Sequence, residues 1–169
     1  MLYNAPRAAT IIANEECLLW KLDRDTFNHI VKDASTRKRQ RYETFLTKVS
    51  ILSTMEPYER SKLSDAFKDH KFAKDSHIIT EGESGNDLFF LQEGEAFATK
   101  AGVDAVLKEY SQGDYFGERA LLKNEPRAAN VIAKTDCTLV SLDRHSVKRL
   151  LGPLEELLKK NMEIYEQYK

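Results

Sequence analysis

The sequence predicts an α+β fold in which a small β-barrel or jelly roll is flanked by helices. From residue 71 onward, short apolar runs alternate with glycine turns, a pattern typical of small all-β domains. The separating glycines are Gly82, Gly85, Gly94, Gly102 and Gly113. Apolar residues at helical spacing lie on both sides of this region. A third observation is an internal repeat, which indicates how the chain divides into domains.

The repeat relates residues 1–24 to residues 121–144 without a gap. The run from Asn4 to Ala9 returns as Asn124 to Ala129, and Cys17 returns as Cys137. A period of about 120 residues fits one compact domain and is too long for a solenoid unit. We therefore expect the C-terminal fragment of a first domain over 1–33, a linking helix over 34–50, and a complete second domain over 51–169.

The first copy predicts two short strands, Ala8–Ala13 and Cys17–Leu22, joined by a polar turn. We expect these strands to lack the rest of their sheet. Because unpaired strands invite association with another chain, self-association and disorder of residues 1–22 are both open alternatives.

Helices are predicted on both sides of the strands. Asp23 is a candidate N-cap for a long helix whose apolar positions run from Phe27 to Val49. Short helices follow over 51–69, with Pro57 in a first turn. The last helix is interrupted at Gly152-Pro153. The strands between them are predicted at Phe72, His77–Ile79, Leu88–Leu91, Ala96–Ala98, Val106–Leu107, Asn130–Ala133 and Thr138–Leu142.

Composition excludes several classes of protein. A net charge of -1 gives no field for nucleic acid or anionic lipid, and no apolar run reaches the ~18 residues of a membrane span. Cys17 and Cys137 occupy equivalent places among apolar residues, so we expect two reduced core cysteines and a cytoplasmic protein.

One segment carries the residues of an anion site. Gly117 allows a sharp turn before a short helix over 118–122, whose first N–H groups favour an anion. Arg127 offers a planar fork suited to phosphate, and Glu118 can accept hydroxyl hydrogen bonds. A phosphate with a vicinal hydroxyl is the sugar-phosphate of a nucleotide; the alternative is a surface ion pair.

The segment from Phe116 to Leu121, followed by Pro126-Arg127-Ala128-Ala129, resembles the phosphate-binding cassette of cyclic-nucleotide-binding domains. More narrowly, the whole chain resembles the regulatory subunits of cAMP-dependent protein kinase. Further matches are Leu142-Asp143-Arg144, Leu151-Gly152-Pro153 and Lys160-Asn161. The resemblance implies an eight-stranded jelly-roll cyclic-nucleotide-binding domain, preceded by the two-strand end of a sister domain and a long linking helix.

The resemblance also implies the role of each site residue. Arg127 would bind the exocyclic oxygens of the cyclic phosphate, and Glu118 would accept the ribose 2′-hydroxyl. Backbone N–H groups at Ala120 and Ala128, with Gly117 at the turn, would complete the pocket. Tyr165 falls where the family places the aromatic ring that stacks on adenine; the alternative for Tyr165 is core packing.

Two positions bear on the ligand. The cGMP-dependent relatives usually have threonine after the cassette arginine, whereas this chain has Ala128, which favours cAMP. Arg119 departs from the leucine or isoleucine usual in the family. Its side chain either points to solvent or alters the field near Glu118.

The first copy matches only part of the family's first cyclic-nucleotide-binding domain. Arg7 corresponds to the phosphate-binding arginine of the first domain, but we expect it to bind no nucleotide here. Tyr58 resembles the cap of that first site. Arg39 and Asp65 resemble residues that relay the occupancy of the first site to the second domain.

The resemblance therefore implies a regulatory module, and not an enzyme, that binds cAMP and no cofactor or metal. Its partner in the full-length parent would be the kinase catalytic subunit, which cAMP releases. The alternative is the cGMP sensor of a cGMP-dependent kinase or channel. A cupin-like metal enzyme is disfavoured because His29, His70, His77 and His145 are scattered, and a DNA-binding regulator because no helix-turn-helix or basic patch is present.

Overall fold

The structure is a computed structural model that describes residues 9–156, 158 and 159. It comprises two compact units, residues 1–37 and residues 38–169, which we describe separately. Arg7 and Tyr165, for which the sequence predicts roles, lie outside the described residues.

The first unit corrects two predictions. The strands expected over Ala8–Ala13 and Cys17–Leu22 are absent, because residues 9–23 form neither helix nor strand where the structure describes them. A strand is held by the hydrogen bonds of a neighbouring strand, and β propensity alone does not replace them. The apolar residues here are exposed, Trp20 to 94%. Cys17 is exposed as well, so only Cys137 is a core cysteine; both are free thiols, as expected.

Helix α1 (Arg24–Leu46) confirms the long helix of the sequence analysis. Asp23 caps it, since its carboxylate accepts the Thr26 backbone N–H at 2.9 Å. In the second unit, the last turns of α1 bury Tyr42, Phe45 and Leu46 completely or nearly so. A 3-10 turn (Ser50–Leu52) and helix α2 (Pro57–Ala66) follow, with Pro57 at the predicted first turn.

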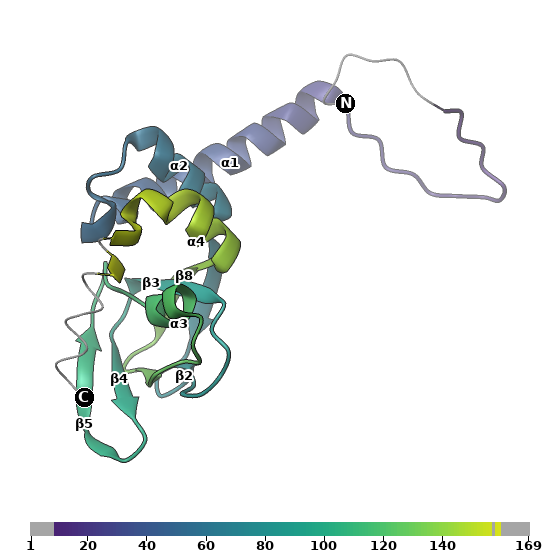
Figure 1. Cartoon of the computed structure of the whole chain (residues 1–169). Helices are drawn as coiled ribbons and strands as arrows, with labels where there is room; N and C mark the ends of the chain where they lie inside the picture. The colour runs from purple at the N-terminus through teal and green to yellow at the C-terminus, as the bar shows by residue number, and fades with distance from the viewer. Residues whose placement is uncertain (1–8, 157, 160–169) are drawn as a thin grey trace. The chain divides into compact units, whose positions relative to one another are not determined.

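The predicted jelly roll is confirmed as two antiparallel four-stranded sheets (Figure 1). One has the order β1-β8-β3-β6 and the other β2-β7-β4-β5. The strands are β1 (Lys68–Phe72), β2 (His77–Ile79), β3 (Asp87–Glu93), β4 (Ala96–Lys100), β5 (Val103–Tyr110), β6 (Tyr115–Phe116), β7 (Asn130–Ala133) and β8 (Cys137–Asp143). Each run of apolar residues predicted between glycine turns lies in one of these strands.

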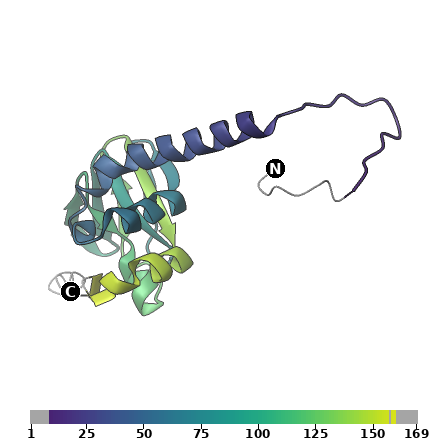
Figure 2. The ribbon, with the colours of Figure 1, turned by 90° about the horizontal axis from the view of Figure 1, so that it is seen from above.

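Helices close the second unit. α3 (Glu118–Lys123) connects β6 to the loop before β7, and α4 (Arg144–Leu151) follows β8 directly. The predicted interruption at Gly152-Pro153 is a 3-10 turn, Gly152–Leu154. α2 and α4 lie side by side over the first sheet, as Figures 1 and 2 show. In the part of the chain that the structure describes, none of the helices is long and apolar enough to cross a bilayer.

Two apolar clusters form the core of this unit. One joins α1, α2 and α4 to the outer face of the first sheet, with Phe90, Val140 and Leu142 at its centre. The other fills the space between the sheets, around Phe89, Phe116 and Leu139. Strands β3 and β8 supply residues to both clusters, because successive side chains of a strand point to opposite faces. The sandwich therefore holds β6, and the turn that follows it, in a fixed place.

Candidate functional site

A pocket of about 490 Å³ opens at the turn between β6 and α3. Strands β2, β4, β5, β6 and β7 contribute apolar side chains to its lining, together with Lys100 and Lys108. The apolar residues are Ile79, Ala98, Leu107, Tyr110, Phe116 and Val131. α3 and the loop after it contribute Glu118 and Arg127. An apolar lining with a few convergent polar groups is the usual construction of a small-molecule site.

The turn at Gly117 requires glycine for two reasons. Its φ of 91° lies in the left-handed region, which side chains disfavour. A Cβ atom at this position would also lie 2.5 Å from Nη1 of Arg127 and 3.1 Å from the carbonyl oxygen of Asp87. Glycine thus permits the guanidinium of Arg127 to approach the backbone at the start of α3.

Arg127 is fixed by both its side chain and its backbone. Its side chain donates from Nη1 to the Gly117 carbonyl and from Nη2 to the Asp87 carbonyl, each at 2.8 Å. Its N–H donates to Glu83 O at 2.8 Å, and its carbonyl accepts the Gly82 N–H at 2.9 Å. Only 8% of Arg127 is exposed, and burial lowers its pKa, yet an arginine remains charged at neutral pH.

Glu118 is the second buried charge of the pocket, with 4% of its surface exposed. Burial raises the pKa of this carboxyl, and the nearby cations Lys108, Arg127 and Arg119 act in the opposite direction. The pocket therefore combines a fixed guanidinium, suited to an oxyanion, with a carboxylate, suited to a hydroxyl group. This pair of groups matches a sugar-phosphate.

Comparison with known proteins agrees with this interpretation of the pocket. The model of the cyclic nucleotide-binding domain matches residues 69–152. A solved structure of a PKAR domain bound to Sp-2Cl-cAMPS is 48% identical, with a TM-score of 0.75 over 79% of this chain and 90% of that one. This chain belongs to the cyclic nucleotide-binding domain family.

Two further similarities extend beyond that single domain. The cAMP-bound structure of PfPKA-R is 49% identical, with a TM-score of 0.80, over 86% of this chain and 51% of that one. The cAMP-dependent protein kinase regulatory subunit of Neurospora crassa is 47% identical over 161 residues, 95% of this chain and 42% of that protein. The chain thus spans less than half the length of the curated relatives it matches.

Within this cyclic nucleotide-binding domain, the structure brings together the predicted site residues that it describes. Gly117, Glu118, Ala120, Arg127 and Ala128 all line the pocket. Tyr165 lies outside the described residues, so its stacking role stays a prediction.

Gly85 supports the pocket in a way that the sequence analysis missed. A Cβ atom at Gly85 would lie 2.6 Å from both Ala120 Cβ and Arg127 Nε, so glycine is needed for this backbone to lie so close to Ala120 and Arg127. From the sequence, Gly82 and Gly85 were interpreted only as turn glycines between strands. The second glycine of that turn was the available signal, because one glycine suffices for most turns.

Arg144 supports the same region from the start of α4. It donates from Nη1 to Leu121 O at 2.8 Å and from Nη2 to Gly85 O at 3.2 Å. Its Nη2 also lies 3.3 Å from Ala120 O, so Arg144 satisfies two of the last carbonyls of α3, which lack intrahelical donors, and ties them to the Gly85 turn. From the sequence, Arg144 was recognised only as part of a family match.

Other predicted residues have clear positions. Arg119 lines the pocket and its Nε lies 3.4 Å from Glu125 Oε2, so its side chain does not simply point to solvent. Arg39 donates to both carboxylate oxygens of Asp65, at 3.0 and 2.6 Å, which places the predicted relay residues in contact. Tyr58 is exposed, with Lys62 Nζ 4.3 Å from its ring centroid. Across the described residues, no group of three or more histidine, cysteine or acidic side chains is arranged to hold a metal ion.

Proposed function

We propose that this chain is a non-catalytic, cAMP-binding regulatory module of a cAMP-dependent protein kinase. The observation that carries the proposal is the pairing of buried Arg127 with buried Glu118 across one pocket. The similarity to regulatory subunits, one of them solved with cAMP bound, supports the same ligand.

Each group has one role in binding. Arg127, which lines the pocket, holds the exocyclic oxygens of the cyclic phosphate. Glu118 accepts the ribose 2′-hydroxyl, and the backbone N–H groups of Ala120 and Ala128 complete the phosphate contacts. The apolar residues around Leu107 and Val131 line the part of the pocket that would accommodate the base. Tyr165 would cover the base by stacking.

The proposed regulation is a linkage between two ligands. cAMP orders the cassette and changes the position of the C-terminal helix, which lowers the affinity of the parent protein for the kinase catalytic subunit. By thermodynamic reciprocity, the catalytic subunit must lower the affinity for cAMP by the same factor. Arg39 and Asp65 would transmit the occupancy of a first site in the parent protein.

Calorimetric titration with cAMP and cGMP tests the proposal. We expect one cAMP site per chain and weaker binding of cGMP, because Ala128 offers no hydroxyl to the guanine amino group. Ala128→Thr should bring the two affinities closer together. Absence of cAMP binding, or tighter binding of cGMP than of cAMP, would refute the proposal.

A further inference from the structure

The loop between α3 and Arg127 is joined back to α3 by a pair of opposite charges. α3 is followed by its C-cap, Asn124, whose φ of 54° and ψ of 39° are left-handed, a conformation that reverses the chain after a helix. The next residue, Glu125, consequently lies beside the first turn of α3. There its Oε2 is 3.4 Å from Nε of Arg119.

The two side chains also connect the two halves of the binding site. Arg119 follows Glu118 directly, and Glu125 lies two residues before Arg127. Both line the pocket, and their side chains are 32% and 48% exposed, so the pair is partly shielded from water. A displacement of the loop would separate them, and a displacement of the first turn of α3 would do the same.

We propose that the Arg119–Glu125 ion pair is a latch that positions the loop carrying Arg127 against α3 and so slows the loss of bound cAMP. Arg119 and Glu125 are positioning residues that act through Arg127 and Glu118. The inference rests on the proposed cAMP binding.

A latch and a purely electrostatic role predict opposite effects of removing the charge of Glu125. Glu125 places a negative charge in the lining of the pocket proposed to bind phosphate, where alone it would weaken anion binding. Pairing with Arg119 compensates that charge. If the two residues acted only through the field of the pocket, removal of Glu125 would strengthen cAMP binding. If they act as a latch, removal of either residue weakens it.

A double-mutant cycle on cAMP affinity and dissociation rate separates these cases. Arg119→Met and Glu125→Gln should each weaken binding roughly two- to five-fold, the range of a partly exposed ion pair, mainly by faster dissociation. The double variant should be no weaker than either single variant. Arg119→Lys, which keeps the charge, should stay within about twofold of the unmodified chain.

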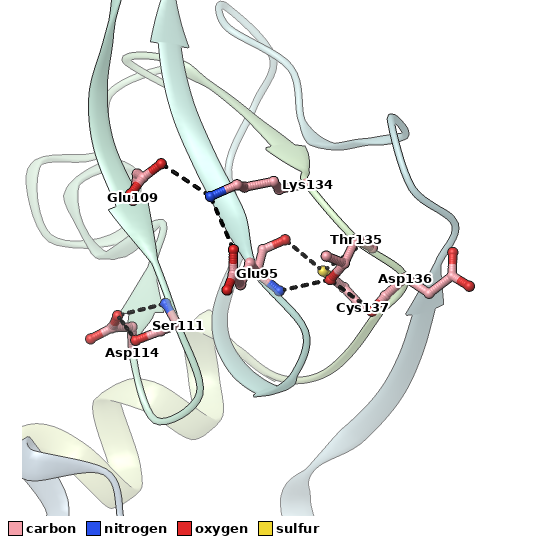
Figure 3. A network of polar contacts seen from close by, with 8 residues as sticks. All are labelled: Glu95, Glu109, Ser111, Asp114, Lys134, Thr135, Asp136 and Cys137. Atoms are coloured by element: carbon pink, nitrogen blue, oxygen red, sulfur yellow. Dashed lines mark hydrogen bonds and ion pairs between the residues drawn. The ribbon is translucent and has the colours of Figure 1, made fainter.

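The matched control is Glu109→Gln, which breaks an ion pair of similar length whose two residues do not line the pocket. Glu109 Oε1 lies 3.3 Å from Lys134 Nζ, which also contacts Glu95 (Figure 3). This control should leave cAMP affinity unchanged. The thermal midpoints of the Arg119 and Glu125 variants should shift no further than that of the control.

Three results would overturn the latch: additive effects of the two substitutions, tighter binding by Glu125→Gln, or unchanged dissociation in every variant. If the unmodified chain itself bound no cAMP, the proposed function would fail first, so the two failures are distinguishable. The coupling energy between Arg119 and Glu125 should also diminish at high ionic strength, because salt screens partly exposed ion pairs.

Discussion

Replacing Arg127 with lysine separates the charge of this residue from its shape. Lysine keeps the positive charge but has a single ammonium group in place of the planar fork. In the structure the fork is already engaged, with Nη1 on Gly117 O and Nη2 on Asp87 O, each at 2.8 Å. The three donors of an ammonium group sit on one nitrogen, which cannot reproduce the two separate positions from which Nη1 and Nη2 reach the carbonyls.

The expected effect is large. A hydrogen bond to a charged group contributes about 1.5–3 kcal/mol, and each 1.4 kcal/mol is tenfold in affinity. Loss of one such contact to phosphate predicts roughly 10- to 150-fold weaker cAMP binding. A buried carbonyl left without its donor should lower the free energy of unfolding by about 1–3 kcal/mol.

Isothermal calorimetry gives the affinity, and urea unfolding without ligand gives the stability. Arg149→Lys is the matched control, because Arg149 is exposed on α4 and its substitution makes the same chemical change. If Arg127→Lys bound cAMP within about twofold of the unmodified chain, the assignment of the phosphate site would be wrong.

Three further predictions concern Glu118, Gly85 and Tyr42. Burial raises the pKa of Glu118 above its ordinary 4.5, so between that value and its native pKa the folded state holds more protons than the unfolded chain. The free energy of unfolding should fall as pH rises through this window. Melting curves of Glu118→Gln recorded over the same pH range should lack this pH dependence. Gly85→Ala should lower the free energy of unfolding in urea by about 1–3 kcal/mol and weaken cAMP binding, because the added Cβ would overlap Ala120. Gly152→Ala is the control, since a Cβ at that position has no neighbouring atom within 4 Å, and it should change neither quantity. Tyr42→Phe should cost about 1–2 kcal/mol in urea unfolding, since the buried hydroxyl, whose pKa burial raises to about 12, donates to Asp69; an unchanged midpoint would contradict that role.

The sequence predicted most of the second unit because its signals are local. Glycines such as Gly94 and Gly113, both at positive φ, mark turns that flank apolar strands, and helix caps such as Asp23 are short-range contacts. The pocket could be predicted as well, since Gly117, Glu118 and Arg127 lie within a single short segment. A resemblance then supplied what spacing could not, namely the ligand.

The predictions that failed or were missed concern contacts across the chain. Cys17 and Trp20 have the pattern of core strand residues, but burial depends on a partner strand, which the pattern cannot supply. The role of Gly85 follows from its approach to Arg127, and that of Arg144 from its reach to Leu121 O. Both contacts join segments far apart in sequence, so the pattern of residues does not identify the partner, although the second glycine of the turn was a signal for Gly85.

The two carbonyl bonds of Arg127 also bear on the entropy of binding. A free arginine side chain samples many rotamers, and fixing them costs about 2 kcal/mol of entropy. In this domain the bonds to Gly117 and Asp87 fix the guanidinium as part of the fold, so that entropy is lost during folding. If Arg127 binds phosphate as proposed, its side chain loses little further freedom on binding, and the ordering by cAMP concerns the rest of the cassette and the C-terminal helix.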